Sequence, residues 1–317
     1  MHLGLTPWRP AANDHAQSLS EQARWAEQLG YDSFWLPENH FNTDAIPDPL
    51  MLLACVAGTT NTIKLATTSY LLPLRHPLQA AEQVAVLDQL SQGRLILGLG
   101  RGLGADMFRA FDIEAKNKRA LFQSNLDLML SAWRGEKVKH DKQKQGGVVL
   151  HPLPKQQPHP PLWVAAFGPK ALKQAGKLGL PYLASPLEGL NDLQNNYLIH
   201  AEACADSGRA IPAIRPAMRL VFISDDEKLL KRVRQTLSEH YRDSPWRSDN
   251  AGLDDWAIVG DVAFAREKIF EYREQLGLTH LIITHLRGTT LECFGAEAPL
   301  RKSLRCALDI CRSIPGT

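Results

Sequence analysis

Four glycines surround one arginine at residues 98–104, which read Gly-Leu-Gly-Arg-Gly-Leu-Gly. Glycine lets the backbone approach a ligand closely, and a guanidinium beside exposed amides suits a phosphate group. We therefore interpret Arg101, with Gly102 beside it, as the centre of an anion-binding turn. A purely structural glycine turn remains the alternative.

The same residues also fit a dinucleotide-binding fingerprint, because Gly100, Gly102 and Ala105 match G-x-G-x-x-A. That fingerprint requires a first strand, a helix that opens at once and a later acidic residue. Here the segment follows the fourth predicted strand, and we expect Met107–Ile113 to lie between the turn and the next helix. We disfavour the dinucleotide interpretation for this reason.

A second anion site is predicted where Phe167-Gly168-Pro169 opens a helix. Backbone amides at a helix N-terminus attract anions. Proline has no amide hydrogen, so Gly168, Lys170 and Ala171 are the expected donors. A Gly-Pro helix start is also common as a purely structural feature. Beside Arg101, however, it would complete a phosphate site.

A polar triplet, Glu38-Asn39-His40, precedes Phe41 at the end of the second predicted strand. Histidine exchanges protons near neutral pH, whereas asparagine can only orient a ligand through hydrogen bonds. We take His40 and Asn39 as candidate catalytic residues and Glu38 as part of a cofactor site. A structural, hydrogen-bonded His40 is the competing interpretation.

These residues are positioned by strands that alternate with helices along the whole chain. The eight predicted strands are residues 3–6, 33–37, 64–69, 94–99, 162–166, 181–184, 215–224 and 280–285. Helices are expected to start at a capping box of Ser18 and Glu21 and at the Asp48-Pro49 N-cap, and to end at Gly30, Gly179 and Gly277. This order predicts an α/β fold, a (β/α)8 TIM barrel in one domain over residues 1–317, with its chemistry at the carboxyl ends of the strands.

Two segments interrupt the alternation. Residues 134–161, rich in Lys, Gln and Pro, form an expected insertion after strand 4, with a hairpin through Val148–Leu150. Residues 242–258 form an expected insertion and active-site loop after strand 7. Trp246 and Trp256 make this loop suitable as a lid, unless the two tryptophans pack into the protein.

Composition excludes several classes of protein. The formal net charge is +2, from 36 basic and 34 acidic residues, which argues against a nucleic-acid-binding surface. The five cysteines show no C-x-x-C spacing, and the histidines show no ligand spacing, so we expect reduced thiols and no metal site. No signal peptide or membrane helix is indicated. We therefore expect a cytoplasmic protein.

Two longer runs carry a family resemblance. They are Leu65–Gln83, LATTSYLLPLRHPLQAAEQ, and Val86–Leu103, VLDQLSQGRLILGLGRGL. Both resemble bacterial luciferase-like flavin monooxygenases, and in pattern most closely the luciferase alpha subunit. The resemblance covers roughly the first 185 residues well and the rest mainly in pattern.

The resemblance implies a (β/α)8 barrel that binds reduced FMN, supplied by a separate flavin reductase, and oxygenates a small organic substrate with O2 through a flavin C4a-hydroperoxide. Arg101 and the Leu103 amide match phosphate contacts of the family. Gly168 and Ala171 match a second set, where serine and threonine are typical of the luciferase. Thr68–Ser69 match a dipeptide under the flavin ring that often carries a non-proline cis bond. The family also implies a homodimer.

Two positions depart from luciferase. Asn39 replaces the histidine needed for light emission, and Gly100 replaces the reactive cysteine. Both changes weaken the case for bioluminescence and leave flavin binding intact. The substrate is expected near Trp8, Asn39, His40 and His285. A deazaflavin-dependent dehydrogenase or reductase on the same fold and a non-catalytic flavin-binding protein remain alternatives.

Overall fold

The computed structural model describes residues 1–8, 15–42, 45–139, 146–242, 244, 251–285 and 293–314. The chain divides into two compact units. Unit 1 consists of Met1–Pro10, Trp25–Phe34 and Ala166–Thr317, and unit 2 consists of Ala11–Arg24 and Trp35–Ala165. The single domain over residues 1–317 stays a prediction.

Unit 2 is built on parallel strands around one central strand. The strands are β3 (Lys64–Thr67), β4 (Tyr70–Leu71), β5 (Leu95–Gly100) and β6 (Leu162–Ala165), joined by the end of β2 (Ser33–Leu36). Strand β5 pairs in parallel with β3, β4 and β6. Only Ile96 of β5 is not fully buried, as expected for a parallel strand that is covered on both faces. The carboxyl ends of these strands therefore share one edge.

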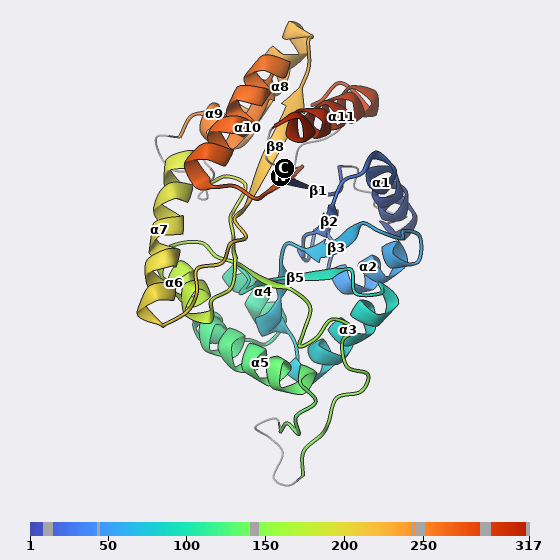
Figure 1. Ribbon diagram of the computed structural model, residues 1–317, viewed down its shortest axis with the longest axis vertical. Coiled ribbons are helices and arrows are strands. Elements are labelled where there is room, and N and C mark those ends of the chain that lie inside the picture. Colours follow the sequence, from blue (N-terminus) through green and yellow to red (C-terminus); the bar gives the residue numbers. More distant parts are fainter. Residues whose placement is uncertain are drawn as a thin grey trace. The chain divides into compact units, whose positions relative to one another are not determined.

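Helices cover the strands of unit 2. They are α2 (Pro49–Ala57), α3 (Pro77–Leu90), α4 (Ala105–Ala110) and α5 (Lys118–Trp133), with the short 3-10 turns η1 (Leu72–Leu74) and η2 (Ala115–Asn117). Helix α2 packs against α3, and α3 packs against α5, as Figure 1 shows. The predicted N-cap of α2 is confirmed, because the Asp48 carboxylate accepts a hydrogen bond of 3.1 Å from the Met51 amide. The Trp133 indole donates to the Ala81 carbonyl at 3.0 Å and ties α5 to α3.

Unit 1 has its own parallel strands, β1 (His2–Leu5), β7 (Tyr182–Leu183), β8 (Pro216–Ile223), β9 (Ala257–Gly260) and β10 (His280–Ile283). Strand β10 lies between β1 and β8, and β8 also pairs with β9. The register pairs Leu5 with Ile283, so β1 and β10 end side by side in the sheet. All residues of β8 are buried.

The helices of unit 1 are α6 (Pro169–Leu178), α7 (Leu190–Asp206), α8 (Glu227–His240), α9 (Leu253–Trp256), α10 (Val262–Leu276) and α11 (Glu297–Ser313), while α1 (His15–Leu29) begins in unit 2 and ends in unit 1. The three predicted glycine helix ends are confirmed. Gly30, Gly179 and Gly277 have φ of +90°, +67° and +61°, a region that disfavours side chains with a Cβ. Each helix stops there and the chain returns to a strand.

Each of the eight predicted strands corresponds to a strand of the structure, but β4, β9, α4 and α9 were not predicted. Helix α4 corrects the prediction that Met107–Ile113 separate the glycine turn from the next helix. Gly104, with φ of +87°, turns the chain so that the helix opens at Ala105. A helix this short leaves little periodicity to detect in a sequence.

The capping box at Ser18 and Glu21 is wrong. Helix α1 already includes His15, and the Ser18 hydroxyl accepts a hydrogen bond of 3.0 Å from the Gln22 side chain one turn later. The Ser18 hydroxyl therefore accepts from the side-chain amide of Gln22, whereas an N-cap hydroxyl would accept from a backbone amide.

The two predicted insertions differ in what the structure describes of them. In residues 134–161, an antiparallel bridge joins Val138 to Val148, so this segment folds back on itself, and residues 140–145 lie outside the described residues. In residues 242–258, Trp246 lies outside the described residues. Trp256 belongs to α9, is fully buried and packs edge-on against Tyr241, so it packs into the protein.

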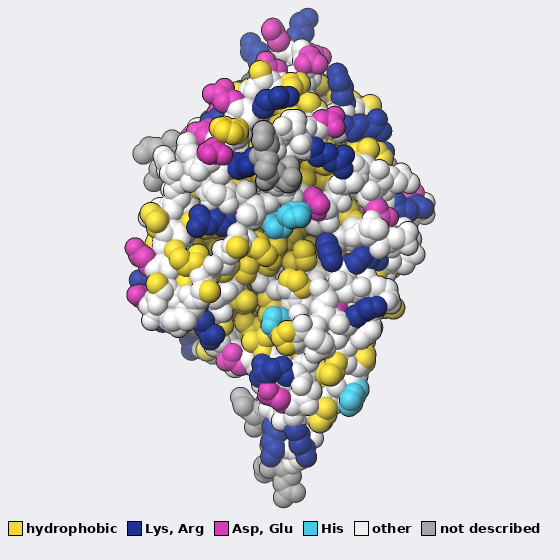
Figure 2. All heavy atoms as spheres, in the orientation of Figure 1, with side chains coloured by type: hydrophobic (Ala, Val, Ile, Leu, Met, Phe, Trp, Pro, Cys, Tyr) yellow, Lys and Arg dark blue, Asp and Glu magenta, His cyan; other side chains and the backbone are white. Residues whose placement is uncertain are grey.

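Charges of both signs are interspersed on the face of the molecule in Figure 2. No helix within the described residues is long and apolar enough to span a membrane. Within the same residues, no three His, Cys, Asp or Glu side chains are grouped in a way that could hold a metal ion.

Candidate functional site

The glycine turn follows β5 in unit 2, at the carboxyl edge of the strands. Gly102 and Gly104 have φ of +75° and +87°, so two of its glycines occupy backbone conformations that other residues rarely adopt. A Cβ on Gly102 would lie 2.8 Å from the Met107 side chain. The glycines are therefore required by the path of the turn, and Arg101 projects from it as a half-buried cation that donates to the Ala165 carbonyl at 3.4 Å.

Two more cations lie close to Arg101, at the start of α5. Burial and the charge of Arg119 lower the pKa of Arg101 to about 10. Burial, Arg101 and Arg119 together lower the pKa of Lys118. The Lys118 ammonium also donates to the Gly102 carbonyl at 3.3 Å, within the glycine turn itself. Three cations that repel one another beside a glycine turn form an electrostatic site for an anion of more than one charge, such as a phosphate monoester.

The neighbouring strand end presents Thr68 and Ser69, directly after β3. The peptide bond between them is cis, as the resemblance implied. The Thr68 amide donates to the Leu36 carbonyl at 2.7 Å, which holds the dipeptide against β2. A Cβ built on Gly100 would overlap the Ser69 hydroxyl and lie 2.9 Å from the Ser69 Cβ. The cysteine found in luciferase at this position is therefore incompatible with Ser69 as it lies here.

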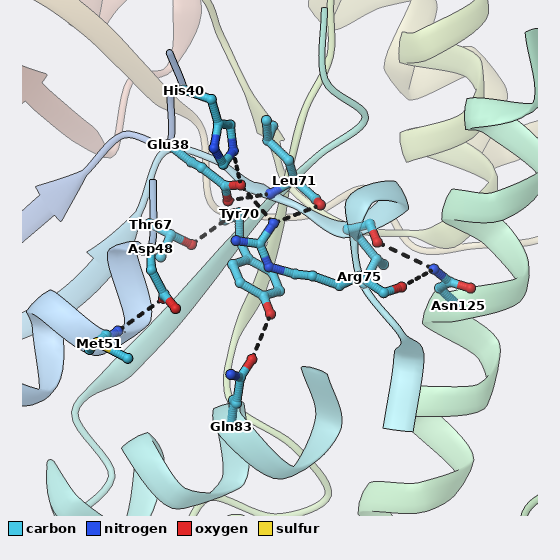
Figure 3. Close-up of polar contacts among 12 residues, drawn as sticks. Glu38, His40, Asp48, Met51, Thr67, Tyr70, Leu71, Arg75, Gln83 and Asn125 are labelled. Carbon is cyan, nitrogen blue, oxygen red and sulfur yellow. Dashed lines mark hydrogen bonds and ion pairs between the residues drawn. The ribbon is translucent and has the colours of Figure 1, made fainter. Parts of the chain in front are cut away.

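The carboxylate of Glu38 is fully engaged within unit 2 (Figure 3). It accepts hydrogen bonds from Arg75 Nη1 at 2.6 Å, from the Leu71 amide at 2.9 Å and from His40 Nε2 at 2.9 Å. The Glu38 side chain is completely buried, and Arg75 packs over the Tyr70 ring at 4.1 Å. A buried carboxylate needs such donors, because an unpaired charge is very costly inside a protein.

This network fixes the chemistry available to His40. Because Glu38 can only accept, Nε2 of His40 carries a hydrogen, and Nδ1 is the acceptor when the ring is neutral. The His40 side chain is only 7% exposed and packs edge-on against Phe111 at 5.0 Å. The more exposed Phe41 packs at tilted angles against both rings. His40 thus has a set orientation, and within the described residues Nδ1 is the ring nitrogen that Glu38 does not engage.

Asn39 is partly committed to the backbone. Its carbonyl oxygen accepts from the Ile46 amide at 3.2 Å and from the Asn42 side chain at 3.3 Å. Any role for Asn39 toward a ligand would therefore fall to its amide NH2 group.

The second predicted anion site lies in unit 1. Gly168 precedes α6 with φ of +79°, and Pro169 is the first residue of the helix. The Ala171 amide already donates to the Gly168 carbonyl at 3.0 Å, and the Ala171 side chain is buried. Of the three expected donors, Gly168 and Lys170 are thus the better suited to an anion. That they act together with Arg101 of unit 2 stays a prediction.

The two predicted substrate contacts also lie in unit 1. Trp8 is buried, donates to Glu297 at 3.3 Å and packs edge-on against Trp25. His285 follows β10, and its amide donates to the Thr6 hydroxyl at 3.0 Å. The structure brings Glu38, His40, Thr68, Ser69 and Arg101 into one unit. The sequence analysis did not name Lys118, Arg119, Arg75 or Phe111 as site residues, although Arg75 lies in the run Leu65–Gln83 that carries the family resemblance. Lys118 and Arg119 are basic residues at a helix start, where such side chains are ordinarily solvated, so no local signal marked these two.

Comparison with known proteins gives a consistent result. Residues 3–280 match the family model described as luciferase-like monooxygenase. The alkanal monooxygenase alpha chain of Photorhabdus luminescens is 27% identical over 230 residues, which cover 71% of this chain and 64% of that protein. The chain thus spans less than two thirds of the length of this curated relative.

Solved structures share the fold. The oxygenating constituent of 3,6-diketocamphane monooxygenase from Pseudomonas putida, in complex with FMN, superposes with a TM-score of 0.79 at 22% identity, covering 96% of both chains. An F420-dependent secondary alcohol dehydrogenase has a TM-score of 0.71 at 17% identity, covering 96% of this chain and 98% of its own. These matches confirm the predicted fold class, an α/β fold with a curled parallel sheet of the TIM-barrel type.

Proposed function

Because this chain belongs to the luciferase-like monooxygenase family, we propose that it is a two-component flavin monooxygenase that uses reduced FMN and O2 to oxygenate a small organic substrate. The cation group of Arg101, Lys118 and Arg119 beside the glycine turn is the observation that carries this proposal, since it suits a phosphate monoester. FMN carries one such group, whereas riboflavin carries none.

The residues of unit 2 fit a flavin mononucleotide. Arg101 and Lys118 would hold the phosphate, with Arg119 adding charge, and the Gly102 and Leu103 backbone would approach it. Leu103 is 53% exposed, so it is open to a ligand. Thr68 and Ser69 offer a platform at the next strand end for the ring. Whether or not unit 2 holds the phosphate, the start of α6 in unit 1 offers the Gly168 and Lys170 amides as a separate predicted anion contact.

When bound, reduced FMN supplies two electrons to O2, so that one oxygen atom enters the substrate and the other leaves as water. The chain's own contribution is orientation and the handling of protons. His40 would accept or donate a proton through Nδ1 while Glu38 holds Nε2. The rings of Phe41 and Phe111 beside it would reduce the access of water.

A second candidate is a deazaflavin-dependent dehydrogenase or reductase, because an F420-dependent enzyme shares the fold. A third is a flavin-binding protein without catalysis, since Asn39 stands where luciferase has a histidine. We further propose that a separate flavin reductase supplies the reduced cofactor and that the chain forms a homodimer.

The test is an anaerobic titration of the protein with reduced FMN, reduced riboflavin and a reduced deazaflavin, compared between wild type, Arg101→Ala and Arg109→Ala. Arg109 is a matched control, because its side chain is 77% exposed and paired with Asp106 on the same turn segment. We expect micromolar or tighter binding of reduced FMN, weakened by about 2–3 kcal/mol in Arg101→Ala and unchanged in the control.

Oxygen is then admitted to the same samples. Slowed, substrate-dependent reoxidation of bound FMN, with an atom of labelled O2 recovered in product, would support the monooxygenase. Preference for the deazaflavin would favour the hydride-transfer candidate. Tight binding of FMN without any oxygen-dependent change would favour the non-catalytic one.

A further inference from the structure

His285 lies in unit 1, two residues after the end of β10, at the level where β1 also ends. The register of Leu5 with Ile283 brings the two strand ends together, and the His285 amide donates to the Thr6 hydroxyl at 3.0 Å. In a barrel of parallel strands, side chains at the carboxyl ends face the ligand-binding edge. The backbone of His285 is thus fixed by a neighbouring strand.

Both ring nitrogens of His285 are buried, and within the part of the chain that the structure describes neither has a hydrogen-bond partner. Two other histidines of the described chain have hydrogen-bond partners: the buried His200 bonds through Nε2 to the Leu180 carbonyl at 2.9 Å, and the half-buried His280 bonds through Nδ1 to the Thr279 hydroxyl at 2.8 Å. Burying a polar group without a partner destabilises a protein, so an unsatisfied ring needs an explanation. A bound molecule that completes its hydrogen bonds is such an explanation.

One aromatic side chain packs against this ring, and a second aromatic side chain packs against the first. Phe294 presents its ring perpendicular to His285, with 6.1 Å between the centroids, and Phe222 packs at a tilted angle against Phe294, with 5.1 Å between the centroids. Both phenylalanines are almost completely buried. A ligand that reaches His285 would therefore meet the aromatic ring of Phe294 and one polar group, a combination typical of sites for small organic molecules.

The charge state of the ring selects the ligand further. Burial lowers the pKa of His285 to about 4, and no acidic side chain within the described residues forms an ion pair with it. At neutral pH the ring is thus uncharged and offers one donor and one acceptor. Such a group recognises a carbonyl or hydroxyl oxygen, whereas a carboxylate would require a positive charge in place of the lost hydration.

We propose that the imidazole of His285 binds the organic substrate of this enzyme, and that this substrate is a neutral, mostly apolar molecule with a carbonyl or hydroxyl oxygen. The inference rests on the proposed function in one respect, because it takes the ligand of this site to be the molecule that is oxygenated. The assignment of the site itself depends only on unit 1.

The first test measures the thermal stability of the full-length protein without ligand. In His285→Phe, a ring of similar shape replaces the unsatisfied polar one, so we expect a higher Tm than wild type. A histidine with a structural role would give a lower Tm instead. His240→Phe is the matched control, since His240 is exposed at the end of α8, and its Tm should change little.

The second test uses defined probes: octanal, cyclohexanone, phenol and, as the charged counterpart of octanal, octanoate. Histidine-labelled protein is titrated by NMR with and without FMN, and the His285 ring signal is identified by its absence in His285→Phe. We expect a saturable shift of this signal with at least one neutral probe and none with octanoate. Ligand-detected NMR should show that His285→Phe binds that neutral probe about tenfold more weakly or worse, as lost hydrogen bonds predict, while His240→Phe does not.

The outcomes separate this inference from the proposed function. If no neutral probe shifts the His285 signal, or if His285→Phe binds the probes as well as wild type, the inference is overturned even where reduced FMN binds tightly. If the probes bind as expected but reduced FMN does not bind, the site in unit 1 stands and the flavin monooxygenase proposal fails. A lower Tm for His285→Phe together with unchanged probe binding would assign the ring to structure alone.

Discussion

Lys118 shows how a side chain without any sequence signal can become part of a proposed binding site. It is the first residue of α5, and it reaches back to the Gly102 carbonyl in the glycine turn. Its pKa is lowered by burial and by two neighbouring arginines, an arrangement that costs free energy in the absence of an anion. The sequence had directed attention to Arg101 alone, so the anion site contains more positive charge than expected.

We predict that Lys118→Met weakens binding of reduced FMN about tenfold, or by about 1.4 kcal/mol, because one charge-assisted contact to the phosphate is lost. Reduced riboflavin, which has no phosphate, should bind both proteins equally. Anaerobic fluorescence titration measures both. Lys116→Met is the control, as Lys116 is exposed and paired with Glu114. An equal loss of affinity for riboflavin would show that Lys118 only shapes the turn.

Glu38, beside the catalytic candidate His40, is a second residue whose role depends on contacts that the sequence did not indicate. The sequence placed it in a cofactor site, and the structure uses its carboxylate for Arg75, the Leu71 amide and His40. Its effect on a ligand would therefore pass through the orientation of His40. Arg75, which is 37 residues away in the chain, is what makes this buried charge tolerable.

At the scale of elements, the run LDQ-x-S-x-GR, which carried much of the family resemblance, serves to connect helices and strands. Asp88 of α3 accepts from both the backbone and the side chain of Gln156, at 2.7 Å each. Arg94 precedes β5 and donates to the carbonyls of Ala57, Thr60, Ile63 and Ser91 and to the Thr60 hydroxyl, at 2.8–3.0 Å. Through these bonds Arg94 holds the loop between α2 and β3 against the start of β5. A recognisable motif thus maintains the strand edge that presents the site, without touching it.

Arg94→Met should therefore destabilise the protein by about 3–5 kcal/mol, because several buried carbonyls lose their donors at once. Urea denaturation gives the free energy of unfolding. Arg134→Met serves as the comparison, since Arg134 is exposed and bonded to Glu136 on the surface, and it should stay close to wild type. A loss below 1 kcal/mol for Arg94→Met would mean that water replaces the guanidinium.

At the scale of the whole molecule, buried ionisable groups give opposite contributions to the dependence of stability on pH. Burial raises the pKa of Glu188 from 4.5 to about 7, against hydrogen bonds from Tyr182, Ser185 and Asn196. The folded protein thus binds this proton more tightly than the unfolded chain. The contribution of Glu188 to the free energy of unfolding is therefore fully present below pH 4.5 and is lost as the pH rises through 7. Burial lowers the pKa of His280 and His285 to about 4, so their contribution is present above 6.5 and is lost as the pH falls toward 4.

We predict that Glu188→Gln removes a decline in stability between pH 5 and pH 8 of at most about 3 kcal/mol. Denaturation curves for wild type and variant across this range measure it: the difference in free energy of unfolding should shift in favour of the variant as the pH rises. Glu274→Gln, at an exposed position of α10, should keep the wild-type slope. Parallel pH profiles for Glu188→Gln and wild type would mean that the three donors keep this carboxylate ionised throughout.

The sequence by itself determined the order of the elements and the features that depend on near neighbours. The Asp48 cap, the three glycine helix ends and the glycine turn around Arg101 each involve backbone or side-chain conformations within a few residues, so local patterns predict them. The family resemblance added the cis bond between Thr68 and Ser69.

Only the tertiary structure decided which residues complete the sites. Lys118 beside Gly102, Arg75 beside Glu38 and the unsatisfied ring of His285 depend on contacts between segments far apart in the chain. Short elements such as α4 and β9 owe their conformation to packing, for example the pairing of β9 with the fully buried β8. Packing and burial energies depend on the neighbours that folding supplies, and no local pattern of residue types contains those neighbours.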